Sequence, residues 1–180
     1  MKPLKPKTCR VCKTKFEPRT STQVVCCTAC AYQKVSADKA RKEAKARREG
    51  LERIKTKAMW MKEAQAAVNA YVRERDKGLP CISCGRHHAG QYHAGHYRTT
   101  KAAPELRFDE FNVNAQCAPC NNHLSGNIVE YRRGLLAKYG LMVVEYLEGP
   151  HEAARYTIDD LQAIKKKYAA RARELAKDGL

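Results

Sequence analysis

The segment "NVNAQCAPCNN", residues 112 to 122, holds Cys117 and Cys120 with asparagines on either side. A C-x2-C pair forms a tight turn that brings two thiolates onto one metal ion. A second pair, Cys81 and Cys84, lies upstream, and 32 residues separate the two pairs. That interval is too long for a minimal zinc finger. We therefore expect the four cysteines to bind one structural Zn²⁺ and to hold a folded insert between them.

A similar arrangement opens the chain, where Cys9-x2-Cys12 and Cys27-x2-Cys30 are separated by fourteen residues. A segment this short has too little apolar area to fold alone, so a Zn²⁺ held by four thiolates would stabilise it. Cys26 competes with Cys27 as the ligand, but only Cys27 keeps the two-residue spacing to Cys30. We expect a second structural Zn²⁺ bound by the two C-x2-C pairs.

Composition indicates the compartment and the class of partner. Nine cysteines at metal-binding spacings are typical of a reducing cytosol rather than of disulfides. The N-terminus lacks the apolar stretch of a secretory signal, and no run of about 18 apolar residues predicts a membrane span. The expected location is cytoplasmic, with no membrane partner.

The formal net charge of +16 is concentrated near the N-terminus. Residues 1–30 carry seven Lys and Arg against one Glu, and residues 31–57 carry ten against four acidic residues. Such a positive electrostatic field favours binding to nucleic acid, because the counterions of the phosphates are released when Lys and Arg neutralise them. A solvated charged face is the alternative interpretation.

Helix formers dominate residues 34–57, but apolar residues are too sparse for a buried stripe. This predicts an exposed basic helix or an arm that orders on DNA. The next helix has an apolar face that includes Trp60 and Tyr71, and Gly78-Leu79-Pro80 ends it. "LMVVEYLEG", residues 141–149, is interpreted as a short strand or extended segment. Thr157, with Asp160 three residues on, predicts the start of a last helix.

Within the insert, "QYHAGHYR" and "RFDEFNV" have the composition of strands, and Lys101 to Glu105 fit the connection between them. After Cys120 a helix is expected, which ends at Gly140. Strand, loop, strand and helix, with zinc at both ends, make up a ββα-metal layout.

The order His96, Asn112, Asn121 around this layout resembles the HNH endonucleases of the His-Me finger superfamily. These have a His at the end of the first strand, an Asn five residues before C-x2-C, and His or Asn directly after it. The C-x2-C, His, C-x2-C-Asn arrangement is also similar to a phage recombination endonuclease that resolves Holliday junctions. Over its whole length the chain more closely resembles the lambdoid phage NinG (Rap) family, described as structure-specific recombination nucleases.

The resemblance implies a role for each matching residue. His96 is the expected general base, since a near-neutral imidazole can take a proton from water. Asn112 is expected to orient the His strand or the loop through hydrogen bonds from its side chain to the backbone. Asn121 is the expected ligand of a catalytic Mg²⁺ or Mn²⁺. Arg98 would stabilise phosphate charge, with a plain DNA contact as the alternative.

Gly95 departs from the pattern, because many HNH enzymes have Asp directly before the catalytic His as a second metal ligand. His93, Asp109 and Asn127 remain candidates for that ligand. His93 would point away from His96 on a straight strand, and a bend at Ala94-Gly95 would be needed to reverse this.

The expected fold is α+β, with a zinc-bound ββα-metal (HNH, His-Me finger) nuclease core, an N-terminal four-cysteine zinc module and flanking α-helices. The expected segments are the zinc module, a basic then amphipathic helical region, the HNH-like core and a C-terminal helix, at residues 1–33, 34–78, 79–148 and 149–180.

The expected function is that of a divalent-metal-dependent endodeoxyribonuclease, a hydrolase. Its substrates would be branched double-stranded DNA intermediates of phage recombination, such as Holliday junctions and D-loops, in the cytoplasm of the bacterial host. Branch specificity rests on the resemblance alone. Symmetric cleavage of a four-way junction would favour a homodimer. The alternatives are a non-catalytic zinc-dependent DNA-binding protein, a sequence-specific HNH nicking endonuclease, and an RNA-binding zinc-ribbon protein.

Overall fold

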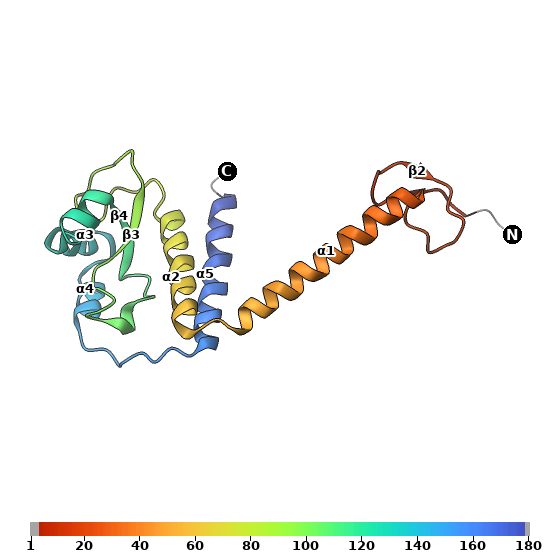
Figure 1. Cartoon of the computed structure of the whole chain (residues 1–180). Coiled ribbons are helices and arrows are strands. Elements are labelled where there is room, and N and C mark those ends of the chain that lie inside the picture. Colours follow the sequence, from red (N-terminus) through yellow and green to blue (C-terminus); the bar gives the residue numbers. More distant parts are fainter. Residues whose placement is uncertain (1–3, 179–180) are drawn as a thin grey trace. The chain divides into compact units, whose positions relative to one another are not determined.

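The computed structural model describes residues 4–178 and shows a mixed α+β chain with two small sheets (Figure 1). Residues 1–3 of the expected zinc module and residues 179–180 of the expected C-terminal segment lie outside the described residues. The chain falls into two compact units, Met1–Lys55 and Thr56–Leu180. Over the described residues, none of the helices combines the length and apolar character needed to cross a membrane.

The first unit pairs a short hairpin with one long helix. Strands β1 (Lys7–Thr8) and β2 (Lys15–Phe16) are antiparallel, and α1 spans Thr28–Arg53. Only Cys30 is buried among the residues of α1, which confirms the expected exposed basic helix. Exposure follows from the sequence, because Ala, Lys, Arg and Glu favour helix without supplying an apolar stripe.

The second unit is built on two packed helices, α2 (Lys57–Arg75) and α5 (Ile158–Asp178), which lie side by side in Figure 1. Their shared core includes Trp60 and Leu161, from the faces predicted by helical periodicity. The start of α5 is also confirmed, because the Thr157 backbone N–H donates to the Asp160 carboxylate at 2.8 Å.

The second sheet is the antiparallel hairpin of β3 (Tyr92–His96) and β4 (Val113–Cys117). The first strand agrees with the prediction, whereas a strand over "RFDEFNV" is wrong except for its last residue. The Asp109 carboxylate accepts hydrogen bonds from the backbone N–H groups of Phe111 (2.8 Å) and Asn112 (3.0 Å). This turn satisfies the backbone locally, so pairing begins only at Val113.

Three helical segments follow β4: η2 (Pro119–His123), α3 (Ile128–Tyr139) and α4 (Leu141–Glu148). The strand expected over residues 141–149 is wrong. Val144 and Leu147 are fully buried at a helical spacing of three and pack in the second core of this unit. That core was not visible from the local composition.

The hairpin has helices on both faces. Ala94 and Val113 pack into the core of α2 and α5. On the other face, the Tyr131 hydroxyl of α3 donates to the Gly95 carbonyl oxygen at 2.8 Å. A buried Asp76 carboxylate at the end of α2 accepts a hydrogen bond from the Ala115 backbone N–H of β4 at 2.9 Å. The hairpin is thus fixed in position from three directions.

Candidate functional site

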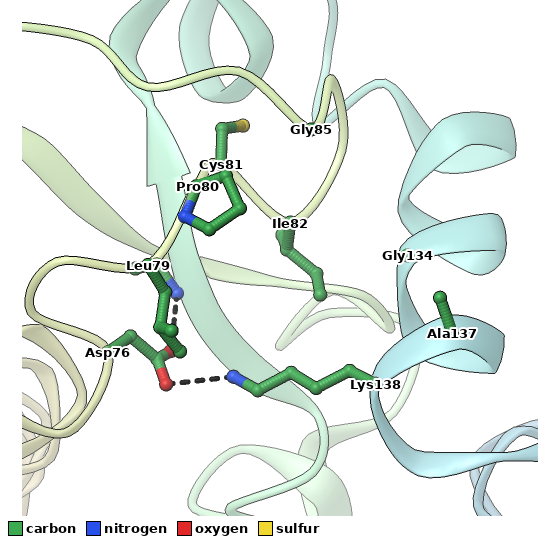
Figure 2. A pocket seen from close by; sticks show the side chains of 10 residues that line it. Asp76, Leu79, Pro80, Cys81, Ile82, Gly85, Gly134, Ala137 and Lys138 are labelled. Carbon is green, nitrogen blue, oxygen red and sulfur yellow. Dashed lines mark hydrogen bonds and ion pairs between the residues drawn. The ribbon is translucent and has the colours of Figure 1, made fainter.

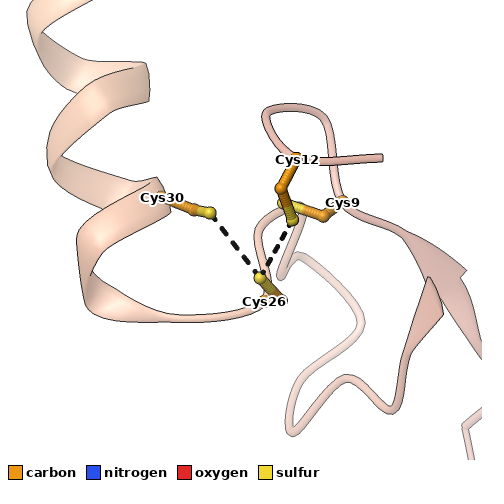
Figure 3. A group of neighbouring side chains, drawn as sticks. All are labelled: Cys9, Cys12, Cys26 and Cys30. Atoms are coloured by element: carbon orange, nitrogen blue, oxygen red, sulfur yellow. Dashed lines mark hydrogen bonds between the residues drawn. The ribbon is translucent and has the colours of Figure 1, made fainter. Parts of the chain in front are cut away.

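Four sulfur atoms gather in the first unit: those of Cys9, Cys12, Cys26 and Cys30 (Figure 3). All four lie within 4.8 Å of one another, and Cys26 Sγ is 3.5 Å from Cys12 Sγ and 3.6 Å from Cys30 Sγ. Zinc–sulfur bonds of about 2.3 Å in a tetrahedron place the sulfurs roughly 3.8 Å apart. The cluster therefore has the geometry to bind Zn²⁺.

The prediction named Cys27 as the fourth ligand, and the structure corrects this to Cys26. Cys27 is the N-cap of α1, with extended backbone and an exposed side chain. Cys30 lies in the first turn of that helix. Cys26 lies just before the helix begins, and the sulfur atoms of the two residues are close together. The neighbouring thiols of Cys12 and Cys30 raise the pKa of Cys26, so the four thiols do not all ionise without a cation.

The second cluster joins the two pairs expected to flank the insert, and its sulfurs also lie within 4.8 Å of one another: Cys81, Cys84, Cys117 and Cys120. Burial and neighbouring thiols raise the pKa of Cys117 to about 12. A Zn²⁺ bound here would offset that penalty and fix the strand end at Cys117 to the loop at Cys81.

His96 ends β3, and its Nε2 lies 3.0 Å from the Arg107 carbonyl oxygen. A carbonyl oxygen only accepts, so Nε2 carries the proton and Nδ1 of a neutral imidazole keeps its lone pair. Burial lowers the pKa of His96 below its ordinary value of 6.5, and the charge on Arg107 lowers it further. The imidazole is therefore held in the neutral tautomer at neutral pH.

Asn112 is fully buried and makes the expected bonds from its side chain to the backbone. Its Oδ1 accepts from the Arg98 backbone N–H at 2.7 Å. Its Nδ2 donates to the carbonyl oxygens of Arg98 (3.0 Å) and Leu106 (2.9 Å). These bonds fix the chain directly after His96 to the connection between the strands.

Asn121 directly follows Cys120, and its side chain approaches the backbone of Gly95. A Cβ added at Gly95 would lie 3.0 Å from Asn121 Oδ1 and 2.2 Å from Gln116 Oε1. The Gln116 oxygen is buried and has no hydrogen-bond partner in the part of the chain that the structure describes. Two amide oxygens thus converge over the residue that precedes His96.

Gln116 was missed by sequence reasoning. Its position directly before Cys117 was the available signal, but an isolated Gln on a strand has no distinctive pattern. Its role depends on which backbone it faces, and only the folded hairpin shows that.

Arg98 lies two residues beyond the end of β3. Its Nε is buried, and no described residue provides it with a hydrogen-bond partner. His93 pairs with Gln116 in the register, and β3 is regular between them, without the bend considered above. Alternation therefore places His93 on the Gly95 side of β3, opposite His96.

A pocket of about 300 Å³ lies at the end of α2, and Cys81 of the second cluster is part of its lining (Figure 2). The Lys138 ammonium donates to the Asp76 carboxylate at 2.8 Å across one wall, and Ile82 faces Gly134 and Ala137. Neither the imidazole of His96 nor the amide of Asn121 lines it. The pocket is mostly apolar and contributes nothing to the polar site on the hairpin.

Comparison with known proteins identifies the family. A family model described as "Bacteriophage Lambda NinG protein" matches residues 1–178. Protein ninG of Escherichia phage 933W is 42% identical over 185 residues, covering 93% of this chain and 92% of the relative. Protein ninG of Salmonella phage P22 and that of Escherichia phage lambda are each 48% identical over 122 residues, covering 68% of this chain and 60% of the relative. No solved structure matches. The chain belongs to the NinG family.

Proposed function

We propose that this chain is a divalent-metal-dependent endonuclease that hydrolyses phosphodiester bonds in branched DNA recombination intermediates, in the manner of HNH enzymes. One observation carries the proposal. His96, the Asn112 tether and the Asn121 oxygen surround a single hairpin whose ends join a four-cysteine cluster, in the order that HNH endonucleases have.

His96 is the proposed general base. Its Nδ1 holds the free lone pair because the Arg107 carbonyl oxygen accepts the Nε2 proton. Nδ1 then removes a proton from the attacking water as the new oxygen–phosphorus bond forms. The bond between phosphorus and the leaving oxygen breaks, and that oxygen takes up a proton from solvent water. Asn112 keeps the backbone after His96 fixed, so the imidazole needs little reorganisation during the reaction.

The residues present fit a hard divalent cation, because the oxygens that converge over Gly95 are amide carbonyls, a ligand class that Mg²⁺ and Mn²⁺ accept. Asn121 would hold the ion through Oδ1. A bound ion would stabilise negative charge on the phosphate and the leaving oxygen. Arg98 is the proposed phosphate contact in the same reaction. Its buried Nε has no hydrogen-bond partner among the described residues.

DNA affinity would come mainly from the first unit. Met1–Lys55 contains sixteen Lys and Arg against five Asp and Glu, whereas residues 81–125 carry four against three. Phosphate contacts position a protein on DNA without reading the bases. This division suits an enzyme that recognises the shape of a junction rather than a sequence.

The deciding experiment is cleavage of labelled four-way-junction and linear duplex DNA in Mg²⁺ or Mn²⁺. The parent chain is compared with His96→Ala and with His87→Ala, a matched control at an exposed histidine. We expect the parent and His87→Ala to cut the junction, and His96→Ala to bind it without cutting. Zinc content and junction binding are measured for all three, so that lost cleavage is not confused with lost folding.

The pH dependence gives an independent check on the base. Since burial lowers the pKa of His96, the imidazole stays neutral until the pH falls below its ordinary value of 6.5. Cleavage should therefore be constant above pH 6.5 and decline only at lower pH. A rate that still rises between pH 7 and 8 would assign the limiting proton transfer to another group.

The second candidate function is non-catalytic DNA binding, favoured by the concentration of charge in the first unit rather than around the hairpin. It predicts that none of the three proteins cleaves the DNA and that all three bind junctions. Cutting of the linear duplex at one preferred site would instead identify a sequence-specific nicking enzyme.

A further inference from the structure

We infer that Gln116 supplies a second oxygen ligand for the catalytic cation, in place of the carboxylate that Gly95 cannot provide. That the ion is catalytic rests on the proposed function, but the ion-binding site itself can be tested separately. The metal-binding pair would then be Gln116 Oε1 and Asn121 Oδ1, two neutral amide oxygens.

The orientation of the Gln116 amide is fixed by its neighbours. Its nitrogen, Nε2, donates to Ser83 Oγ at 2.6 Å and to the Gly126 carbonyl oxygen. The Gly126 oxygen only accepts, so exchanging the amide nitrogen and oxygen would place two acceptors against each other. Oε1 must therefore be the atom that points toward Gly95.

That oxygen is fully buried and has no hydrogen-bond partner within residues 4–178. Buried acceptors in folded proteins nearly always have a hydrogen bond, so an unpaired one calls for a physical explanation. The Asn121 nitrogen, Nδ2, donates to Asn122 Oδ1 at 2.8 Å, which leaves Asn121 Oδ1 as the atom over Gly95. Two acceptors directed at one point repel each other unless a cation or a donor lies between them.

Gly95 makes room for this arrangement. Its φ is not in the left-handed region, so the backbone itself would accept any side chain. Space is the constraint, because a Cβ would lie 2.2 Å from Gln116 Oε1 and 3.0 Å from Asn121 Oδ1. Both oxygens therefore lie on the side of Gly95 toward which a Cβ would project.

The second cysteine cluster holds both ligands in place. Gln116 directly precedes Cys117, and its amide is bonded to Ser83, which lies between Cys81 and Cys84. Asn121 directly follows Cys120. The structural zinc would therefore fix the ligands of the catalytic ion, and removing it should release both.

The position agrees with the pattern that Gly95 breaks. In the HNH arrangement the second ligand comes from the residue directly before the base. Here the oxygens of Gln116 and Asn121 converge over that same residue, Gly95, but the Gln116 oxygen comes from β4 instead of β3. The proposed second ligand therefore belongs to β4, the strand that pairs with β3.

The first test measures Mn²⁺ binding by electron paramagnetic resonance. The chain carries His96→Ala, so that a bound four-way junction stays intact, and DNA without protein supplies the baseline. Adding Gln116→Ala should weaken Mn²⁺ binding at least tenfold. Gln91→Ala, the same change at an exposed site just before β3, is the matched control and should leave Mn²⁺ affinity unchanged.

Two further variants keep the test decisive if Gln116→Ala disturbs folding. Gly95→Ala leaves the Gln116 amide in the chain but places a methyl group 2.2 Å from its oxygen, so it too should weaken Mn²⁺ binding. The reciprocal pair Gly95→Asp with Gln116→Ala restores an oxygen from β3 and should recover Mn²⁺ affinity. Zinc content and the melting temperature report on the fold of each variant.

The outcomes separate the two proposals. Unchanged Mn²⁺ affinity in folded, zinc-loaded Gln116→Ala and Gly95→Ala would overturn the ligand assignment while leaving cleavage by the parent intact. Mn²⁺ binding that depends on Gln116 in a chain that cuts no junction would overturn the nuclease proposal and keep the site. A parent complex that binds no more Mn²⁺ than DNA alone would overturn the site itself.

Discussion

Adjacent cysteines at the start of α1 differ in what their side chains can reach. Cys26 contacts the sulfurs of Cys12 and Cys30, whereas Cys27 caps the helix and is exposed. Cys27 Sγ lies 3.8 Å from Cys26 Sγ, but it is not one of the four sulfurs that lie within 4.8 Å of one another. Spacing rules assume a loop at the second pair, and here a helix replaces it.

This difference makes a prediction at the residue scale. Cys26→Ser should reduce bound zinc from two ions to one per chain and unfold the small hairpin of the first unit, since this unit has little apolar core to replace the metal. Cys27→Ser, the matched control, should keep both ions. Zinc measured by atomic absorption, with far-ultraviolet circular dichroism, distinguishes the two. Equal zinc loss in both variants, or loss only in Cys27→Ser, would restore the ligand set expected from spacing.

Among single residues, the sequence indicated His96, Asn112 and Asn121 through their order, and the structure places all three around one hairpin. Their catalytic roles stay predictions. Gln116 could not be recognised in this way, because its significance comes from an unpaired oxygen and the glycine that it faces.

At the scale of elements, α3 packs closely on the loop of the second cysteine cluster. A Cβ added at Gly134 would lie 1.9 Å from the Ile82 carbonyl oxygen, a backbone atom that cannot move aside easily. The glycine is therefore required by the distance between helix and loop, not by its own conformation. The same loop contains Ser83, which holds the Gln116 amide.

Gly134→Ala should consequently destabilise the second unit by roughly 1 to 3 kcal/mol, as overpacking of a close contact does. Alanine usually stabilises a helix relative to glycine by about 0.5 to 1 kcal/mol, so the expected sign is opposite to the general rule. Gly50→Ala in α1, where nothing lies within 4 Å of the added Cβ, is the matched control and should increase helix stability. Thermal and denaturant unfolding measure both effects. A stabilised Gly134→Ala would mean that α3 does not pack on this loop as described.

Composition predicted α1 and β3, and the spacing of apolar residues predicted α2, α3 and α5, because both are local properties of the chain. The prediction was wrong at residues 141–149, where continuous apolar character suits a strand as well as a buried helix. The short segment became α4 because Val144 and Leu147 pack against Leu135 of the preceding helix. Leu135 comes next to these residues only in the folded chain, so the local sequence does not show this contact.

For the whole molecule, the distribution of charge predicts where DNA affinity arises. Lys42, Arg47 and Arg48 are exposed on α1, and the triple change of these residues to Gln should weaken junction binding and lower its salt dependence. Each lost phosphate contact reduces the slope of log affinity against log salt by about 0.9, so up to three contacts give a change of about 2 to 3.

The matched control changes Lys166, Arg173 and Lys177 of α5 to Gln, which removes the same charge from another exposed helix. Fluorescence anisotropy with a labelled four-way junction at several salt concentrations measures both proteins. Equal losses of slope in the two would show that affinity follows net charge and not the basic helix.

The sequence by itself determined the two groups of cysteines, the basic helix, the amphipathic helices and the order of polar residues, because spacing, charge and periodicity are local properties. Tertiary structure decided the choice of Cys26, the helical state of residues 141–149 and the convergence of Gln116 and Asn121 over Gly95. Each of these depends on what a side chain meets after the chain has folded. Such contacts join residues from different elements, and no local pattern records them.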